Sequence, residues 1–150
     1  GADKILINSE AVKNPNFIYE LSKRFGNQSI VINMEVKMIN NNWEVFVTNG
    51  RDRTGLEVSD WIKKCQDLGA GEIMVTSIDK EGTGKGPDIK LVEKIQNTSK
   101  LPVIYSGGIG NLEDVKSLVK LKVDGLALSR VLHYNLHTVS EIKKSLDQIS

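Results

Sequence analysis

The chain has 150 residues, of which 39% are hydrophobic and 26% charged, and its formal net charge is +1. This balance predicts one globular domain over residues 1–150, because disorder requires low hydrophobicity or high net charge, and it excludes a strong field that would attract nucleic acid. The single cysteine, Cys65, excludes an intramolecular disulfide and fits a reducing cytoplasm, and no run approaches the roughly 20 apolar residues of a membrane helix.

Short apolar runs alternate with longer amphipathic segments five times along the chain. Strands are expected at Lys4–Asn8, Ser29–Lys37, Glu72–Ile78, Pro102–Ser106 and Gly125–Ser129. Helices are expected at Pro15–Phe25, Leu56–Leu68, Ile89–Thr98, Leu112–Leu121 and Val139–Gln148. Helix-start signals support these segments: Asn14-Pro15, capping boxes from Thr54 to Glu57 and from Thr138 to Glu141, and the caps Asp88 and Asn111. The segment Trp43–Val47 is expected to form a small hairpin excursion.

The alternating order of strands and helices predicts parallel strands with right-handed crossovers. In the second strand, one face is apolar and the other is semi-polar: the first holds Ile30, Ile32, Met34 and Val36, and the second Val31, Asn33, Glu35 and Lys37. A doubly wound sheet would be apolar on both faces, so the pattern favours a barrel lumen, although a solvated or subunit-covered face stays open. A closed (β/α)8 barrel takes about 250 residues, so we expect a partial barrel that pairs with missing sequence, a copy of itself or another protein.

Two glycine-containing or basic segments follow the last two strands, where barrels commonly bind phosphate. Ser106-Gly107-Gly108 ends one strand and opens a helix, so its backbone N–H groups can approach an anion. Ser129-Arg130 ends the next strand and offers a hydroxyl and a guanidinium. A lone pair of glycines is usually a turn, but the two features together predict a phosphate site.

Candidate reactive groups lie at other strand ends. Glu35 sits near the end of its strand on the semi-polar face and predicts a general acid or base, with a structural salt bridge as the alternative. Asp79 is similar, with a capping role as its alternative. It leads into a loop over residues 80–86 that contains Gly82 and Thr83, which we interpret as a mobile surface segment able to contact a ligand and act as a lid.

Charged or metal-ligating residues elsewhere carry weaker expectations. Lys4 and Glu72 begin their strands on one face at the opposite end of the barrel, where they predict either a gate or a plain ion pair. His133 and His137 lack further ligands nearby, so no metal site is expected, and no cofactor is implied.

Several segments together resemble the cyclase subunit of imidazole glycerol phosphate synthase. The similar segments are Gly1–Ser9, Gly69–Asp79, Ser106–Gly108 and Ser129–His133. The resemblance covers the whole chain, from the family's fourth strand to its last helix. It implies a TIM barrel of histidine biosynthesis that takes ammonia from a partner glutaminase and reacts it with a ribulose-bearing ribonucleotide carrying two phosphates. The substrate is a phosphorylated small molecule, and the reaction is that of a lyase.

The resemblance also implies roles for single residues. Glu35 and Asp79 match catalytic positions, Lys4 and Glu72 match a charged ammonia gate, and Asp3 matches the glutaminase docking face. One phosphate site is implied for Asn8 and Ser9, and the other for Gly82, Gly107, Gly108, Ser129 and Arg130.

Two departures from the family keep other functions open. Glu35 replaces an aspartate, which moves the acid by one methylene, and Arg130 replaces the usual serine. The loop over residues 81–86 also resembles a sister group that works with a glutaminase to make amidino-modified sugars of bacterial surface polysaccharides. A third alternative is a non-catalytic half-barrel that associates with itself and binds phosphate. The family's first catalytic aspartate lies outside this chain, so we expect the chain alone to be inactive.

Overall fold

The fold was obtained as a computed structural model, which describes residues 4–128 and 135–138. The elements in chain order are β1 (Ile5–Ile7), α1 (Ser9–Lys13), α2 (Asn16–Phe25), the 3-10 helix η1 (Asn27–Ser29), β2 (Ile30–Ile39), β3 (Asn42–Val47), β4 (Asp52–Glu57), α3 (Val58–Leu68), β5 (Glu72–Ser77), α4 (Ile89–Thr98), β6 (Val103–Ser106), α5 (Leu112–Lys120), β7 (Gly125–Leu128) and β8 (Asn135–Thr138). The five predicted strands correspond to β1, β2, β5, β6 and β7, and four of the five predicted helices to α2, α3, α4 and α5. The predicted helix Val139–Gln148 lies outside the described residues.

All eight described strands belong to one sheet, whose centre is parallel. β1, β2, β5, β6 and β7 run parallel in that order, as the alternation of strands and helices predicts. β3 and β4 form the predicted hairpin excursion and pair antiparallel. β1 and β3 lie one after the other along the same edge of β2, because β1 pairs with Ile30–Ile32 and β3 with Glu35–Ile39.

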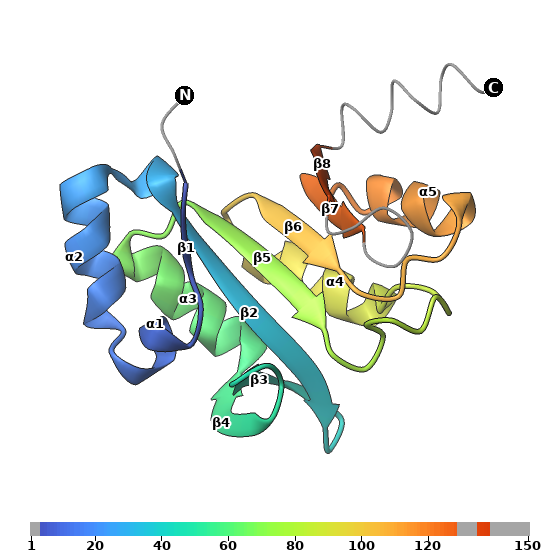
Figure 1. The fold of residues 1–150 in the computed structure, drawn as a ribbon, viewed down its shortest axis with the longest axis horizontal. Coiled ribbons are helices and arrows are strands. Elements are labelled where there is room, and N and C mark those ends of the chain that lie inside the picture. Colours follow the sequence, from blue (N-terminus) through green and yellow to red (C-terminus); the bar gives the residue numbers. More distant parts are fainter. Residues whose placement is uncertain (1–3, 129–134, 139–150) are drawn as a thin grey trace.

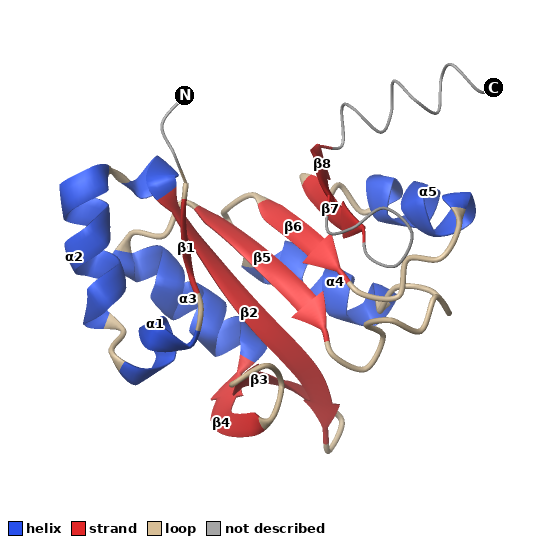
Figure 2. Ribbon diagram, in the orientation of Figure 1, coloured by secondary structure: helices blue, strands red, loops and turns tan. Residues whose placement is uncertain are grey.

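Helices cover only one face of the sheet. Figures 1 and 2 show α3 and α4 behind the strands, with no described helix across the front. The apolar face of β2 is fully buried under these helices, at Ile30, Ile32, Met34 and Val36, as its alternation predicts. The opposite face is partly exposed at Asn33, Glu35 and Lys37. The fold is therefore α/β with a mostly parallel, one-sided sheet, consistent with part of a TIM barrel.

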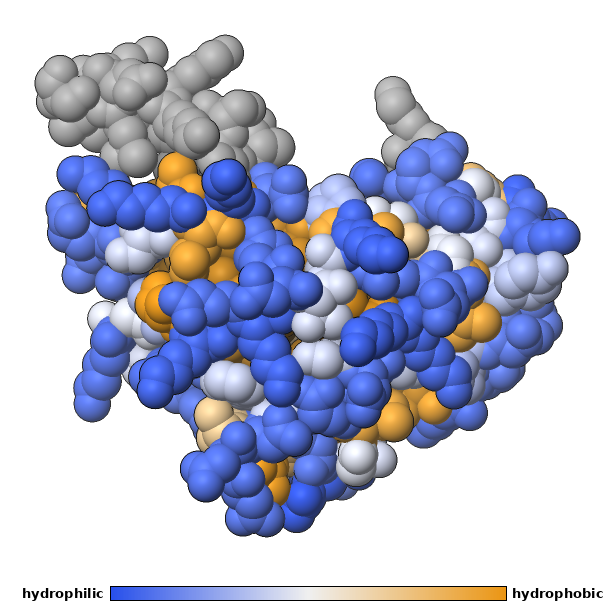
Figure 3. All heavy atoms as spheres, turned by 180° about the vertical axis from the view of Figure 1, so that it is seen from behind, coloured by the Kyte–Doolittle hydropathy of each residue, from blue (hydrophilic) through white to orange (hydrophobic). Residues whose placement is uncertain are grey.

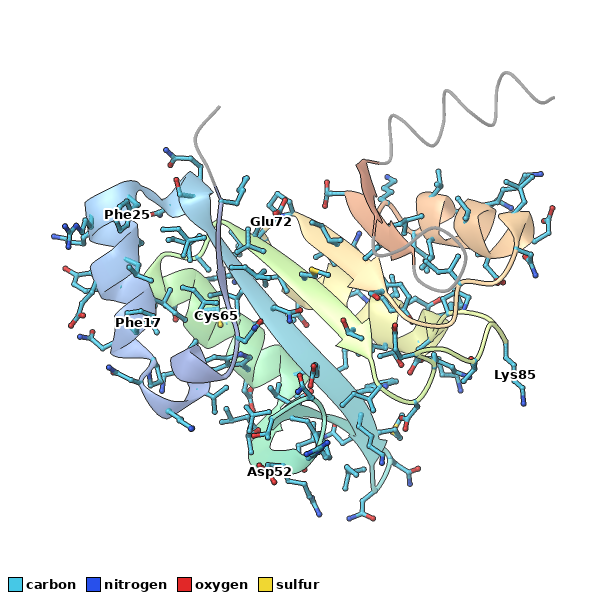
Figure 4. The ribbon with its side chains drawn as sticks, viewed as in Figure 1. Phe17, Phe25, Asp52, Cys65, Glu72 and Lys85 are labelled. Carbon is cyan, nitrogen blue, oxygen red and sulfur yellow. The ribbon has the colours of Figure 1, made fainter. Side chains whose placement is uncertain are left out.

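The core lies between the sheet and the helices. Trp61, Ile62 and Cys65 of α3 pack in the main cluster with β2 and β5. Cys65 is fully buried, and burial raises its pKa to about 12. Figure 4 shows it on α3, behind β2. The outer helix faces are largely hydrophilic in the rear view of Figure 3, and no described helix is long and apolar enough to cross a membrane.

The helix caps confirm the predicted signals at Asp88 and Asn111 and correct those at Asn14 and Thr54. The N-cap of α2 is Pro15, without a side-chain cap, so Asn14 does not cap this helix. Asp88 accepts from Leu91 N–H at 3.2 Å and Asn111 from Asp114 N–H at 3.0 Å, as predicted. Thr54 does not cap α3, because it lies within β4 and its hydroxyl donates to the Val45 carbonyl of β3. Glu57 is the N-cap instead and accepts from Asp60 N–H at 3.1 Å. Strand pairing thus overrides the local capping pattern.

Three short elements were not predicted. α1 and η1 are five and three residues long, and β8 pairs antiparallel with the outer edge of β7. Glu141 lies outside the described residues, so the capping box predicted from Thr138 cannot be followed.

Candidate functional site

Three adjacent parallel strands bring polar residues into one row, level with the carboxyl ends of β5 and β6. Glu35 of β2 pairs with Thr76 of β5, and Thr76 pairs with Ser106 of β6. Paired residues in parallel strands point to the same face of the sheet, which here is the face without helices. This register places Glu35 and the Ser106-Gly107-Gly108 segment on the same face of the sheet.

Glu35 lines a pocket of about 60 Å³. The pocket lies where β2 passes from its pairing with β1 to its pairing with β3, and it is lined by Asn8, Val12, Asn33, Glu35, Val45, Phe46, Val47, Asn49 and Trp61. We call it the Glu35 pocket. Glu35 Oε2 and Asn33 Oδ1 are buried there without a hydrogen-bond partner among the described residues. Burial raises the pKa of Glu35, an effect that the Gly50 backbone N–H partly offsets.

Two asparagines hold the edge of this pocket. Asn33 Nδ2 donates to Asn8 Oδ1 at 2.8 Å, and this bond links the end of β1 to β2. The bond leaves Asn33 Oδ1 as an acceptor, which a donor group on a ligand or a water can satisfy. Ser9, the other predicted phosphate residue of this part, begins α1.

Asp79 lies two residues past the end of β5 and is exposed. Its Oδ2 accepts from the Met38 backbone N–H at 3.0 Å, so the carboxylate is tied to β2 three residues beyond Glu35. The two predicted catalytic carboxylates therefore come from neighbouring strand ends. The alternative ion pair of Glu35 with Lys37 is not among those of the described residues.

The segment Ser106-Gly107-Gly108, which we call the glycine turn, has a backbone that requires glycine. Gly107 and Gly108 have φ of 126° and 82°. A Cβ at Gly107 would stand 2.9 Å from the Ser77 carbonyl oxygen, and one at Gly108 would clash with the Gly86 carbonyl oxygen. The turn thus combines positive φ with close backbone approach, which are the properties expected of an anion-binding turn.

The loop over residues 80–86 is docked on the glycine turn. Gly86 N–H donates to the Gly108 carbonyl at 2.8 Å, and the Ser106 hydroxyl donates to Glu81 Oε2 at 3.3 Å. Within the loop, Thr83 Oγ1 donates to the Lys80 carbonyl at 2.7 Å, while Gly82 has open space around it. These contacts place Gly82 and Thr83 beside the turn, as a ligand-contacting loop requires, and Figure 4 shows Lys85 at its outer end.

The charged pair at the other end of the strands is not joined. The register places Lys4 and Glu72 on the same face, at the amino ends of their strands. Lys4 Nζ donates to the Gln28 carbonyl at 2.9 Å, and no ion pair of the described residues joins it to Glu72. The plain ion pair is therefore absent here, and the gate stays a prediction; Figure 4 labels Glu72.

Some predicted positions lie outside the described residues: Asp3, Ser129, Arg130 and His133. Among residues 4–128 and 135–138, no three His, Cys, Asp or Glu side chains gather to hold a metal ion.

Sequence reasoning missed residues that shape the site. Glu81 binds Ser106, and Tyr105 donates to the Gly107 carbonyl at 2.9 Å. Asn33 was placed on the correct face by the alternation of polar and apolar residues, but it was not singled out. No local pattern marks Tyr105, because Asp88, whose N–H donates to the tyrosine hydroxyl, comes from a distant part of the chain.

Comparison with known proteins yields consistent similarities. A family model described as histidine biosynthesis protein matches residues 1–138. The subunit HisF of imidazole glycerol phosphate synthase from Alkaliphilus metalliredigens is 40% identical over 151 residues, which cover 99% of this chain and 60% of that protein. The proteins of the same name from Dictyoglomus thermophilum and Prochlorococcus marinus strain MIT 9515 are 42% and 44% identical, over 99% and 97% of this chain and 59% and 58% of their own lengths. The chain thus spans about three-fifths of the length of these relatives.

Proposed function

Because the chain belongs to the histidine biosynthesis protein family, we propose that it supplies the C-terminal part of a cyclase of the imidazole glycerol phosphate synthase type. The proposed reaction joins ammonia to a ribulose-bearing ribonucleotide with two phosphates and splits it into imidazole glycerol phosphate and an aminoimidazole carboxamide ribonucleotide. The ammonia comes from a glutaminase partner, and the proposed compartment is the cytoplasm.

The observation that carries this proposal is the row of Glu35, Thr76 and Ser106 on one face of three neighbouring strands, level with the carboxyl ends of β5 and β6. In (β/α)8 barrels this end holds the chemistry. Glu35, whose Oε2 is buried without a partner among the described residues, and the glycine turn therefore lie on the same face of the sheet, which supports a reactive group and an anion site in one active site.

The carboxyl groups of Glu35 and Asp79 differ in how far they are exposed to solvent. Burial raises the pKa of Glu35, so it retains a proton at higher pH than an exposed carboxyl and suits a general acid. Asp79 is exposed and fixed by the Met38 N–H, which leaves Oδ1 to accept a proton or a substrate hydroxyl. The two groups frame the reacting centre in this proposal.

The phosphates are assigned to two places. One lies at the glycine turn and the loop beside it, with Ser129 and Arg130 contributing from the end of β7, and includes Gly82, Thr83, Ser106, Gly107 and Gly108. The other lies at Asn8 and Ser9, where β1 ends. Lys4 and Glu72 at the amino ends of the strands would admit ammonia to the face that carries the row.

The phosphate site is tested by a matched pair of variants, Gly82→Asp and Gly55→Asp. Both glycines have similar φ, 74° and 76°, and neither has an atom within 4 Å of an added Cβ. Calorimetric titration of the chain with inorganic phosphate should show a binding step that Gly82→Asp abolishes by charge repulsion and that Gly55→Asp, on β4, leaves unchanged. Equal affinities for both variants would remove the assignment of phosphate to this loop.

The reaction is tested on the parent protein, supplied with an ammonium salt and the ribonucleotide. Formation of imidazole glycerol phosphate, lost on Glu35→Gln, is the expected result. A parent protein that binds the ribonucleotide but gives no product would contradict the cyclase assignment.

A second candidate is favoured by Glu35 itself, since the resemblance places an aspartate there. It is the sister activity, in which ammonia amidinates a sugar for a surface polysaccharide. Turnover of an ammonium salt with a nucleotide-linked sugar, without turnover of the ribonucleotide, would select it.

A further inference from the structure

The glycine turn is held from beneath by a fully buried tyrosine. Tyr105 directly precedes the turn in the sequence. Its side chain has no exposed surface and packs with Val92, Leu118 and Leu126. Its hydroxyl donates to the Gly107 carbonyl at 2.9 Å and accepts from the Asp88 N–H at 2.9 Å. Both hydrogen-bonding directions of the hydroxyl are therefore used, and the Gly107 carbonyl is fixed toward the core.

Fixing a carbonyl also fixes the N–H on the other side of the same peptide. In a trans peptide the C=O and the following N–H point in opposite directions, and the described chain has no cis peptide bonds. The Gly108 N–H consequently points away from Tyr105. The Gly108 carbonyl is held in the same way by the Gly86 N–H at 2.8 Å, which directs the Ile109 N–H away from the loop. Two successive N–H groups are oriented in advance, as in an anion-binding nest.

The tyrosine is itself held by a chain of hydrogen bonds from the hairpin. Asp88 caps α4 through Oδ1 and accepts from Trp43 Nε1 through Oδ2 at 3.2 Å. Burial raises the pKa of Tyr105, with the nearby Asp88 charge adding to the effect, so the hydroxyl keeps the proton that it donates.

We propose that Tyr105 is a positioning residue for anion binding: by holding the Gly107 carbonyl it aims the Gly108 N–H at a phosphate group of the substrate. This inference rests on the proposed function, since it deepens the assignment of phosphate to the glycine turn. Tyr105 does not touch the anion. It acts through the turn. Trp43 supports Tyr105 indirectly, because it donates a hydrogen bond to Asp88, which in turn donates to the tyrosine hydroxyl.

The test is Tyr105→Phe in the full chain, with inorganic phosphate as the ligand in calorimetric titration. The phenyl ring keeps the packing, and only the hydroxyl is lost. The expected result is a phosphate affinity about tenfold weaker, which corresponds to about 1.4 kcal/mol. The phosphate-induced change in the Gly108 amide signal, followed by NMR, should shrink in parallel.

Ser22→Ala is the matched control. Ser22 is buried on α2, away from the turn, and its hydroxyl contacts two carbonyl oxygens, those of Tyr19 at 2.9 Å and Leu68 at 3.3 Å. This control should lower the melting temperature without changing phosphate affinity. Weakening of phosphate binding to the same degree in both variants would overturn the proposal, because lost stability would then explain it.

The remaining outcomes separate the positioning role from the phosphate site. If Gly82→Asp abolishes binding and Tyr105→Phe binds like the unmodified chain, the site stands and the role of Tyr105 is overturned. If the unmodified chain binds no phosphate, both are overturned. If Tyr105→Phe does not fold, Trp43→Phe is used in its place. Phosphate binding about threefold weaker would support the positioning of Tyr105 by Trp43 and Asp88, and unchanged phosphate binding would overturn it.

Discussion

The Glu35 pocket and the glycine turn differ in how their polar atoms are satisfied. In the pocket, Glu35 Oε2 and Asn33 Oδ1 are buried without partners in the described structure. In the turn, the Ser106 hydroxyl and the carbonyls of Gly107 and Gly108 are all paired with groups of the same chain. A paired turn binds an anion without reorganising, whereas unpaired buried oxygens raise the cost of folding until a ligand or water donates to them. The comparison separates a turn whose polar atoms are already paired from a pocket whose buried oxygens have no partner in the described structure.

The largest expected effect comes from Gly108→Ala, which disrupts the glycine turn. The added Cβ meets the Gly86 carbonyl and stands at a positive φ, so the free energy of unfolding in urea should fall by about 2 kcal/mol or more. Gly82→Ala, at a similar φ in open space, should cost about 1 kcal/mol. Equal losses would mean that the loop does not dock on the turn in solution.

Glu81→Gln sharpens the comparison by removing a negative charge from the turn. The Glu81 carboxylate accepts from Ser106, where it opposes an incoming anion. Phosphate affinity at low salt should rise about fivefold, on the order of 1 kcal/mol for a nearby like charge at the surface. Glu93→Gln, exposed on α4, is the control and should change nothing. An unchanged affinity for Glu81→Gln would show that the charge does not face the bound phosphate.

Asn8→Ala tests the Glu35 pocket and should change the free energy of unfolding by a smaller amount. It removes the bond from Asn33 Nδ2 to Asn8 Oδ1, which is exposed, so the free energy of unfolding should fall by about 0.5 kcal/mol. Phosphate binding at the glycine turn should be unaffected, because the turn lies on β6. A loss of several kcal/mol would indicate that the asparagine pair organises the whole pocket.

The smallest effect, and one of opposite sign, is expected for Glu35→Gln. A carboxyl whose pKa is raised on folding binds more protons in the folded state, so stability is full at low pH and falls as pH rises from the ordinary carboxyl value of 4.5 through the raised pKa. Glutamine removes this loss, and the melting temperature should be slightly higher than that of the unmodified chain at pH 7 and the same at about pH 3. Solvent screening keeps the gain small. A variant that is less stable at pH 7 would contradict the cost ascribed to the buried carboxylate.

Periodicity predicted the strands, the helices and the semi-polar face, because alternation and capping are local properties of a few residues. Thr54 shows the limit: its capping pattern is genuine, but pairing of β4 with β3 uses its hydroxyl elsewhere. The resemblance indicated Glu35 and the glycine turn by position. Glu81 and Tyr105 escaped notice, since their partners, Ser106 and Asp88, meet them only once the strands are aligned. The Glu35 pocket lies where the pairing of β2 with β1 ends and its pairing with β3 begins. No local sequence pattern predicts this gap, so the buried oxygens of the pocket could not be predicted either.

The antiparallel strand β8 has a consequence for assembly. It occupies the outer edge of β7 with four paired residues, from Gly125 opposite Thr138 to Leu128 opposite Asn135. An incoming parallel strand can add to β7 only by strand exchange, trading one ladder for another at little net gain in hydrogen bonding. Closure into a larger sheet through β7 therefore requires β8 to detach first, and until then β8 covers this edge of β7.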